Sequence, residues 1–494
     1  MTESLSVADN INAWFEPMVD MLSAVLFWDP LAAAGLDTGT RVPLVVIWLI
    51  AGGAYFTVRM GFVNILGFRH AVGLVRGKYD KPGDKGEVSS FQALATALSA
   101  TVGLGNIAGV AIAITIGGPG ATFWMIFAGF FGMTLKFTEC TLGMKYRTID
   151  DKGEVSGGPM YYLRDALEIK NMKYTGRILS VVFAVMLVVA SWGGGNMFQS
   201  NQAFSQIVYL FPTFERLGFV FGLLMAILVG IVIIGGIKSI ARVTSRIVPF
   251  MAVLYVGTAL VIIIMNIGNI GQVFSLIING AFSPAALKGG ILGVLIIGFQ
   301  RGAFSNEAGL GSASIAHSAA KTDEPVSEGL VALLEPFIDT VIICTMTAMV
   351  IIFTGLYDNP DGLEGAPLTS AAFATVFSWF PYLLGLAIML FAFSTMISWS
   401  YYGLKGFDFL FGNLSLRIFG NKKVSAVLFQ FIFLFFIVVG SSSNLGSVID
   451  FSDMMILSLA FPNIAGLFIL APEVRKEMKS YFDRRRKGLI RPYK

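Results

Sequence analysis

Residues 101–109, Thr101-Val102-Gly103-Leu104-Gly105-Asn106-Ile107-Ala108-Gly109, place glycines and an asparagine inside an otherwise apolar run. The run covers residues 91–116, and about 20 apolar residues are enough for an α-helix to cross a bilayer. Glycine destabilises a helix interior, so the stretch predicts a helix that is interrupted within its span. In a membrane, the backbone N–H and C=O groups freed by such an interruption must find partners inside the protein.

Similar interruptions occur elsewhere in the chain. The apolar run 289–312 ends in Arg301-Gly302-Ala303-Phe304-Ser305-Asn306-Glu307-Ala308-Gly309-Leu310-Gly311-Ser312, and polar clusters also lie at 193–202 and 393–400. Residues 105–109 form a GxxxG pattern, for which close helix packing is the simpler interpretation. Because four clusters lie at corresponding positions in the two halves of the chain, we favour a substrate and ion pathway over packing alone.

The composition identifies the class of protein. Hydrophobic residues make up 55% of the 494 residues and charged residues only 13%, whereas soluble domains carry about 25% charge. The chain is therefore expected to be a polytopic membrane protein. Eleven apolar stretches predict transmembrane helices, at 43–63, 91–116, 122–144, 178–207, 217–237, 244–266, 289–312, 329–356, 381–407, 425–440 and 448–470.

The basic residues predict the orientation in the membrane. Thirty of the 35 Lys and Arg residues fall on one side of the eleven predicted helices, and only Arg41, Arg216 and Lys288 fall on the other. Basic loops stay in the cytoplasm, so the N-terminus is expected outside and the C-terminus inside. The basic tail is interpreted as an anchor for anionic lipid, and no nucleic-acid partner is expected.

The order of the helices suggests an inverted repeat. If the first helix is set aside, ten helices form two sets of five, and a broken helix opens each set. The predicted parts are an extracytoplasmic segment, an extra helix, two five-helix repeats and a basic cytoplasmic tail, at 1–42, 43–63, 91–266, 289–470 and 471–494.

Ionisable residues inside the predicted helices usually face the bundle interior. Lys136 and Glu139 share a helix face at i, i+3 and are expected to pair. Arg301 and Glu307 are interpreted first as a gating or structural pair, with direct binding of a substrate carboxylate and a coupling ion as the alternative. Asp450 and Asp453 are expected to cap a helix start.

A broken helix offers two kinds of ligand. Its second half presents free N–H groups and a positive dipole, which suit a carboxylate. Carbonyls freed before the break, with nearby hydroxyls, suit a hard cation or an ammonium group. A zwitterionic amino acid carries both charges. His317 is expected to be a solvated loop histidine.

Four motifs make the sequence similar to a known family. They are SATVGLGNIAG (99–109), GGPGATFWM (117–125), GGPMYY (157–162) and NEAGLGS (306–312). The chain resembles the alanine or glycine:cation symporters, also called sodium:alanine symporters, from about residue 43 to 475. The resemblance implies an all-α LeuT-type fold, with a five-plus-five inverted repeat and one extra N-terminal helix, and uptake of small neutral amino acids driven by a sodium gradient.

The resemblance also implies site residues. Backbone amides of Gly103, Leu104 and Gly105 would hold the substrate carboxylate. Sodium would be bound by the carbonyls of Ser99 and Val102 with the hydroxyls of Ser394 and Thr395. The amino-acid pocket would further be lined by Thr101, Asn106, Gln199 and Trp399. Trp399 would limit the size of the substrate side chain, the alternative being an ordinary lipid-facing or interfacial tryptophan.

The expected function is sodium-coupled symport of alanine or glycine by alternating access, in the cell (inner) membrane. Proton coupling through Glu307 or Asp339 is the alternative, and a channel is a more distant one. No enzymatic activity, no cofactor beyond Na⁺ as coupling ion and no obligate protein partner are expected.

Overall fold

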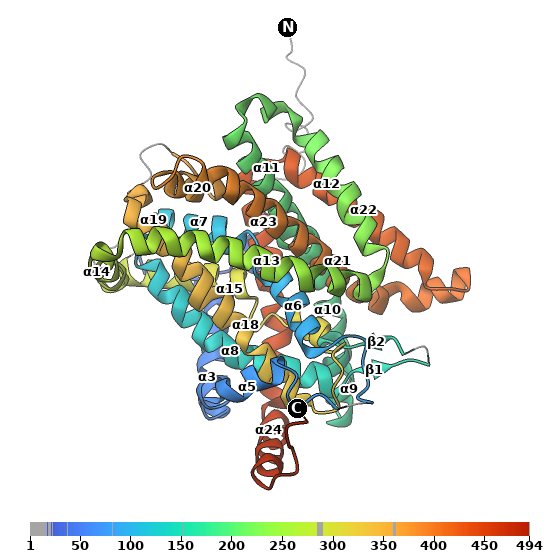
Figure 1. The fold of residues 1–494 in the computed structure, drawn as a ribbon. Coiled ribbons are helices and arrows are strands. Elements are labelled where there is room, and N and C mark those ends of the chain that lie inside the picture. The colour runs from blue at the N-terminus through green and yellow to red at the C-terminus, as the bar shows by residue number, and fades with distance from the viewer. Residues whose placement is uncertain are drawn as a thin grey trace.

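The fold is almost entirely helical (Figure 1). The computed structural model describes residues 17, 21, 23–36, 38–81, 83–151, 153–283, 290–358 and 362–493. Half of the predicted segment 1–42, and the stretch 284–289, which includes the first residue of the second predicted repeat, lie outside the described residues.

The elements of the first half begin with short α2 and end with α14. They are α2 (Pro30–Ala33), α3 (Leu44–Arg59), α4 (Val63–Leu66), α5 (Phe68–Val75), α6 (Ser90–Thr101), η1 (Gly105–Gly109), α7 (Val110–Gly117), α8 (Ala121–Lys145), β1 (Thr148–Ile149), β2 (Val155–Ser156), α9 (Pro159–Ile169), α10 (Lys173–Trp192), η2 (Gly193–Met197), α11 (Phe198–Leu210), η3 (Pro212–Leu217), α12 (Gly218–Ile233), α13 (Gly236–Met265), η4 (Ile267–Asn269) and α14 (Ile270–Phe282). The two strands form an antiparallel hairpin.

The second half follows after residue 289. Its elements are α15 (Gly290–Asn306), α16 (Ala313–His317), α17 (Pro325–Ala332), α18 (Leu334–Pro336), η5 (Phe337–Cys344), α19 (Thr345–Thr354), η6 (Leu356–Asp358), α20 (Ala366–Ala374), α21 (Phe380–Phe419), α22 (Lys423–Ser442), α23 (Leu445–Ser458) and α24 (Ala460–Arg486). α24 runs to the lower end of the molecule in Figure 1, close to α5 and the C-terminus.

The first predicted break is present. α6 begins with a capping box, in which the Ser89 hydroxyl accepts from the Gln92 N–H and the Gln92 amide oxygen accepts from the Ser89 N–H. The helix ends at Thr101, and the following helical segment, Gly105–Gly117, is bent by 50° from it. A single broken span is therefore formed by α6, η1 and α7.

The second break does not begin at residue 301, where its polar stretch begins, but after residue 306. α15 continues through Arg301 to Asn306. The chain then turns at Glu307, Gly309 and Gly311, whose φ angles are 55°, 82° and 85°. Positive φ is readily available to glycine but costly for glutamate, so Glu307 is held there by its contacts.

All eleven predicted stretches overlap helices of the structure. Eight helices among the described residues are long and apolar enough to cross a membrane, and nine if the bent pair counts as one span. α3 has only 16 residues. The structure thus establishes a multi-span helical protein, while the count of eleven and its orientation stay predictions.

Small residues allow the central helix α8 to pack closely on its neighbours. A Cβ atom added at Gly302 would lie 2.8 Å from the Cβ of Ala128, and one added at Gly132 would lie 2.8 Å from the Cβ of Ala308. Both distances are shorter than van der Waals contact, so glycine is required at this interface. α8 therefore supports both α15 and the second break.

The buried charges pair differently from the sequence-based expectation. Arg301 does not pair with Glu307; both of its terminal nitrogens donate to Asp453 of α23. Lys136 pairs with Glu335 at 3.1 Å, not with Glu139. The expected pairs were neighbours in sequence, whereas the observed pairs join different helices.

The expectation for α23 was also wrong. Its N-cap is Asn444, whose side chain accepts from the Ser447 N–H at 3.0 Å. Asp453 therefore lies inside the helix, where it pairs with Arg301, and Asp450 is exposed. The apolar stretch began later than the helix does, which misplaced the helix start.

Asp453→Ala is expected to destabilise the protein strongly. Removing one partner of a buried pair leaves the other charge unpaired, at a cost of about 3–5 kcal/mol. The measurement is the thermal unfolding midpoint in detergent. Glu215→Ala, at an exposed position in η3, serves as the control. Equal midpoints for the two variants would contradict a structural role of the Arg301 pair.

Candidate functional site

The polar clusters that are distant in sequence meet in the interior. The end of α6 packs on the middle of α21, η1 packs on the end of α15, and η2 packs on α21 and α15. A Cβ atom added at Gly105 would lie 3.4 Å from the Cα of Ser305, so the two breaks approach each other directly. The structure thus brings together residues that the resemblance had assigned to one site.

The first amides after the break bond to side-chain oxygens. The Gly103 N–H donates to Oδ1 of Asn106 at 2.9 Å, and the Leu104 N–H donates to Oε1 of Gln199 at 3.1 Å. The Gln199 amide in turn donates to the Gly194 carbonyl at 2.8 Å. Both amides thus donate to side-chain oxygens, which are acceptors of the kind that a carboxylate presents. The Gly103 N–H also donates to the Thr101 carbonyl at 2.8 Å.

Hydroxyl groups of α21 meet the end of α6. The Thr395 hydroxyl donates to the Ser99 carbonyl at 2.9 Å, and the Ser99 hydroxyl donates to the Ser394 carbonyl at 2.7 Å. The Ser398 hydroxyl donates to that of Ser99 at 3.0 Å. The Ser394 hydroxyl instead donates to the Phe391 carbonyl of its own helix at 3.1 Å. Of the two expected hydroxyls, only that of Thr395 bonds to α6 in this structure.

Trp399 lies in the interior and does not face lipid. Its side chain is 1% exposed, and a Cβ at Gly195 would overlap its indole ring. The indole N–H donates to Oε1 of Glu307 at 2.9 Å. Glu307 also accepts from the Ser312 hydroxyl at 2.5 Å. The glutamate with positive φ therefore fixes the orientation of the tryptophan.

Asp339 joins the two broken helices. Its carboxylate accepts from the Asn106 amide at 2.7 Å and from the Ser305 hydroxyl at 2.8 Å. The sequence marked Asp339 as an acid in an apolar stretch and as an alternative residue for proton coupling, and gave no sign that it bridges the breaks. Its role as a bridge depends on the fold, which places η5 between the breaks.

Two further predicted site residues, Thr101 and Val102, lie at the start of the first break but make no hydrogen bond to another helix of the described chain through their side chains. The Thr101 hydroxyl donates to the Ala97 carbonyl of its own helix at 3.3 Å. Val102 is the C-cap residue that follows the last residue of α6. Both are buried at the start of the break.

The expectation that His317 is a solvated loop histidine is wrong. It is fully buried, with Nδ1 2.6 Å from Glu328 and Nε2 2.5 Å from Glu335. Glu335 also pairs with Lys136, so a chain of ionisable groups connects α8, α16, α17 and α18. The loop composition around His317 gave no sign of these partners, which come from later helices.

Segments flanking the two broken helices are joined at one end of the bundle. The Arg147 guanidinium donates to four carbonyl oxygens, of Ser318, Ala320, Lys85 and Thr322, at 2.6–2.8 Å. A parallel β-bridge also links Val88 to Ala320. The segment before α6 and the segment after α16 are therefore closed against each other.

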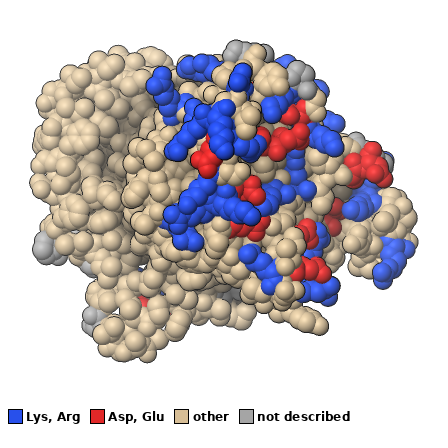
Figure 2. Space-filling view, turned by 90° about the horizontal axis from the view of Figure 1, so that it is seen from below, with Lys and Arg blue, Asp and Glu red and all other residues tan. Residues whose placement is uncertain are grey.

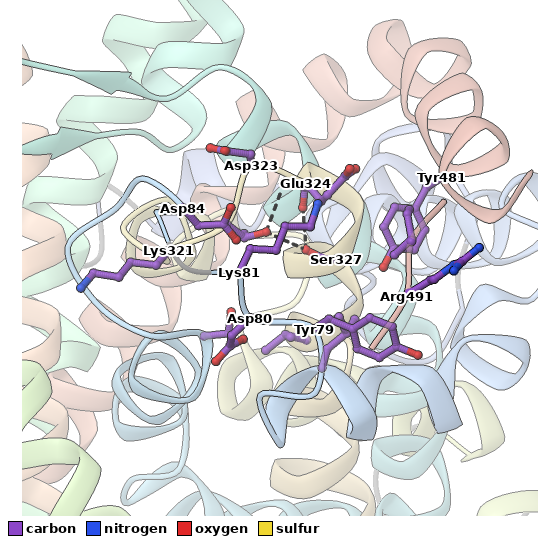
Figure 3. Close-up of a pocket in the computed structure, with 15 residues that line it drawn as sticks. Tyr79, Asp80, Lys81, Asp84, Lys321, Asp323, Glu324, Ser327, Tyr481 and Arg491 are labelled. Atoms are coloured by element: carbon purple, nitrogen blue, oxygen red, sulfur yellow. Dashed lines mark hydrogen bonds between the residues drawn. The ribbon is translucent and has the colours of Figure 1, made fainter. Parts of the chain in front are cut away.

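The C-terminal helix reinforces this closure. Arg484 donates to both carboxylate oxygens of Glu324 at 2.6 Å. Figure 3 shows Glu324 and Ser327 beside Lys81 and Asp84 in the adjoining pocket, with Tyr481 and Arg491 of the C-terminal region on another side.

Multiple membrane-crossing helices with two breaks around a buried polar site form the architecture of secondary transporters. The family model described as the sodium:alanine symporter family matches residues 33–494. The chain belongs to this family.

Similar proteins agree with this assignment. The sodium/alanine symporter AgcS of Methanococcus maripaludis is 41% identical over 447 residues, covering 90% of this chain and 95% of AgcS. The probable sodium/glutamine symporter GlnT of Bacillus subtilis is 35% identical, with 90% and 89% covered. The crystal structure of MhsT in complex with L-phenylalanine is matched with a TM-score of 0.54 at 16% identity, covering 80% of this chain and 100% of MhsT. That likeness establishes a LeuT-like fold.

Glu307 is expected to act on the site through Trp399. Glu307→Ala removes the acceptor of the indole N–H, so amino-acid affinity should fall by about tenfold, a loss near 1.4 kcal/mol. Glu307→Gln keeps an acceptor oxygen and should retain most of the affinity. Binding of alanine to purified protein is the measurement. If both variants bind as the unmodified protein does, Glu307 does not position Trp399.

Proposed function

We propose that the protein is a sodium-coupled symporter of small neutral amino acids, such as alanine or glycine, and works by alternating access. The observation that carries this proposal is the meeting of two broken helices at a buried site with two chemical sides. One side offers backbone N–H groups and the other offers carbonyl and hydroxyl oxygens. Belonging to the sodium:alanine symporter family supports cation-coupled amino-acid symport in general.

The amino acid would bind between the first break and α21. Its carboxylate would replace the side-chain oxygens at the amides of Gly103 and Leu104, with Gly105 next in line. Gln199 would turn its amide group toward the substrate. Trp399 would set the upper limit on the side chain, because its ring already contacts the backbone at Gly195.

Sodium would bind where α6 meets α21. The Ser99 and Val102 carbonyls and the Thr395 hydroxyl are oxygen ligands of the kind that hard cations prefer, and Ser394 lies next to them in α21. Sodium bound here would link α6 to α21 and so organise the amino-acid site beside it. The relatives' names agree with sodium as the coupling ion: sodium/alanine for AgcS and probable sodium/glutamine for GlnT.

Alternating access requires one end of the site to open while the other closes. We place the closed end at Arg147, which joins the segments flanking both breaks. With the N-terminus outside and eleven spans, this end would face the cytoplasm. Release of substrate and sodium would then require the Arg147 contacts to separate.

Proton coupling remains the second candidate, because two buried carboxylates lie at the breaks. Glu307 bonds to an indole and a hydroxyl, and Asp339 bonds to an amide and hydroxyls. Each could take up a proton without losing all of these partners. A relative in Bacillus subtilis is named a putative sodium/proton-dependent alanine carrier, YrbD.

Uptake of labelled alanine into proteoliposomes separates the two mechanisms. Sodium coupling predicts accumulation under an inward sodium gradient and none when potassium replaces sodium. Proton coupling predicts accumulation in a pH gradient without sodium. Equal uptake with and without the sodium gradient would contradict the proposed sodium symport.

The two neighbouring hydroxyls of α21 provide a matched test of the cation site. Thr395→Val removes the hydroxyl that reaches the Ser99 carbonyl, so the sodium concentration for half-maximal uptake should rise by about tenfold. Ser394→Ala removes a hydroxyl that bonds within its own helix, and its effect should be smaller. A larger effect of Ser394→Ala would mean that Ser394, and not Thr395, supplies the hydroxyl ligand. If neither variant changes the sodium requirement, sodium does not bind at this position.

A further inference from the structure

A groove separate from the interior site runs between the end of α3 with α4 and the C-terminal helix α24. Its volume is about 810 Å³, and five cationic side chains line it: Arg59, Arg475, Lys479, Arg485 and Arg486. Figure 2 shows the face of the molecule seen from the α24 end. Lys and Arg side chains gather on one part of this face, with Asp and Glu side chains among them, while the other part of the face shows few charges.

The charged residues on the two sides of α24 differ in their ion-pair partners. On one side, Glu473 and Glu477 pair with Lys145, and Arg484 pairs with Glu324. Positions 475, 479, 482 and 486 recur with helical spacing on the other side, which lines the groove. Only Arg486 among the groove cations lies within 4.0 Å of a carboxylate of the described residues, that of Asp483.

Arg59 gives a second, independent indication of a ligand. Its Nε atom is shielded from water and has no hydrogen-bond partner among the described residues. A buried donor without a partner is costly, and an anionic oxygen would satisfy both the donor and the charge. The groove therefore combines unneutralised positive charge with an unsatisfied donor.

The surroundings favour a lipid over a free anion. Met60, Val63, Met478 and Phe482 give the groove an apolar component beside its cations. Leu66 at the rim is 78% exposed, and the neighbouring Ile65 is 57% exposed. An apolar rim beside a basic wall, at the end of a helix that crosses the membrane, matches the two parts of a phospholipid.

We propose that this groove binds the phosphate head group of an anionic phospholipid, whose acyl chains lie along the apolar residues of α3 and α4. Arg59 and the cations of α24 would contact the phosphate. Because α24 also carries the Arg484 contact to Glu324, a bound lipid would brace α3 and α24 at the closed end of the bundle.

Binding of phosphatidylglycerol to the purified protein in neutral detergent, followed by native mass spectrometry, tests the proposal. The triple variant Arg59→Gln, Arg475→Gln, Lys479→Gln should lower its affinity by about tenfold or more. The control variant Lys170→Gln, Arg177→Gln, Lys238→Gln removes the same charge at exposed positions outside the groove and should bind as the unmodified protein does.

Leu66→Asp provides a second variant that keeps every cation and should weaken phosphatidylglycerol binding by placing an acid at the rim. Phosphatidylcholine should bind weakly to all variants. Inorganic phosphate should fail to displace phosphatidylglycerol. Equal binding of the two lipids, equal loss in the control variant, or displacement by inorganic phosphate would overturn the proposal.

Discussion

The structure depends on one constraint: a backbone that leaves the helix inside a membrane must bond all of its polar groups within the protein. At the first break, side-chain oxygens of Asn106 and Gln199 take the Gly103 and Leu104 amides. At the second, Glu139 accepts from the Gly311 N–H at 3.0 Å, and Asn463 donates to the Gly309 carbonyl at 2.8 Å.

These partners explain why so many polar residues are buried in an apolar chain. Asn106 serves both as an acceptor for the Gly103 amide and as a donor to Asp339, which also accepts from Ser305. The partners of one break thus reach the other. A substrate or ion that replaces one of these partners would affect both broken helices, which is the coupling that symport requires.

The sequence predicted the helical class, the first break and the residues that gather at it. The class and the break rest on apolar length and on local glycine and polar patterns, which act within one helix, whereas the site residues are those that the family resemblance implies. It failed for pairs between helices. Lys136 pairs with Glu335 and not with Glu139, Arg301 with Asp453 and not with Glu307, and the partners of His317 are Glu328 and Glu335. Such partners depend on helix packing, which one sequence does not reveal; the spacing of acids in apolar runs was the only available signal.

The central claim is that sodium and the amino acid occupy adjoining parts of one site and stabilise each other's binding. Calorimetric titration of the purified protein with alanine tests it most directly, in sodium and in potassium at equal ionic strength. The account predicts that alanine binds at least about tenfold more tightly in sodium, a coupling free energy near 1.4 kcal/mol. Equal affinity in the two salts would contradict it.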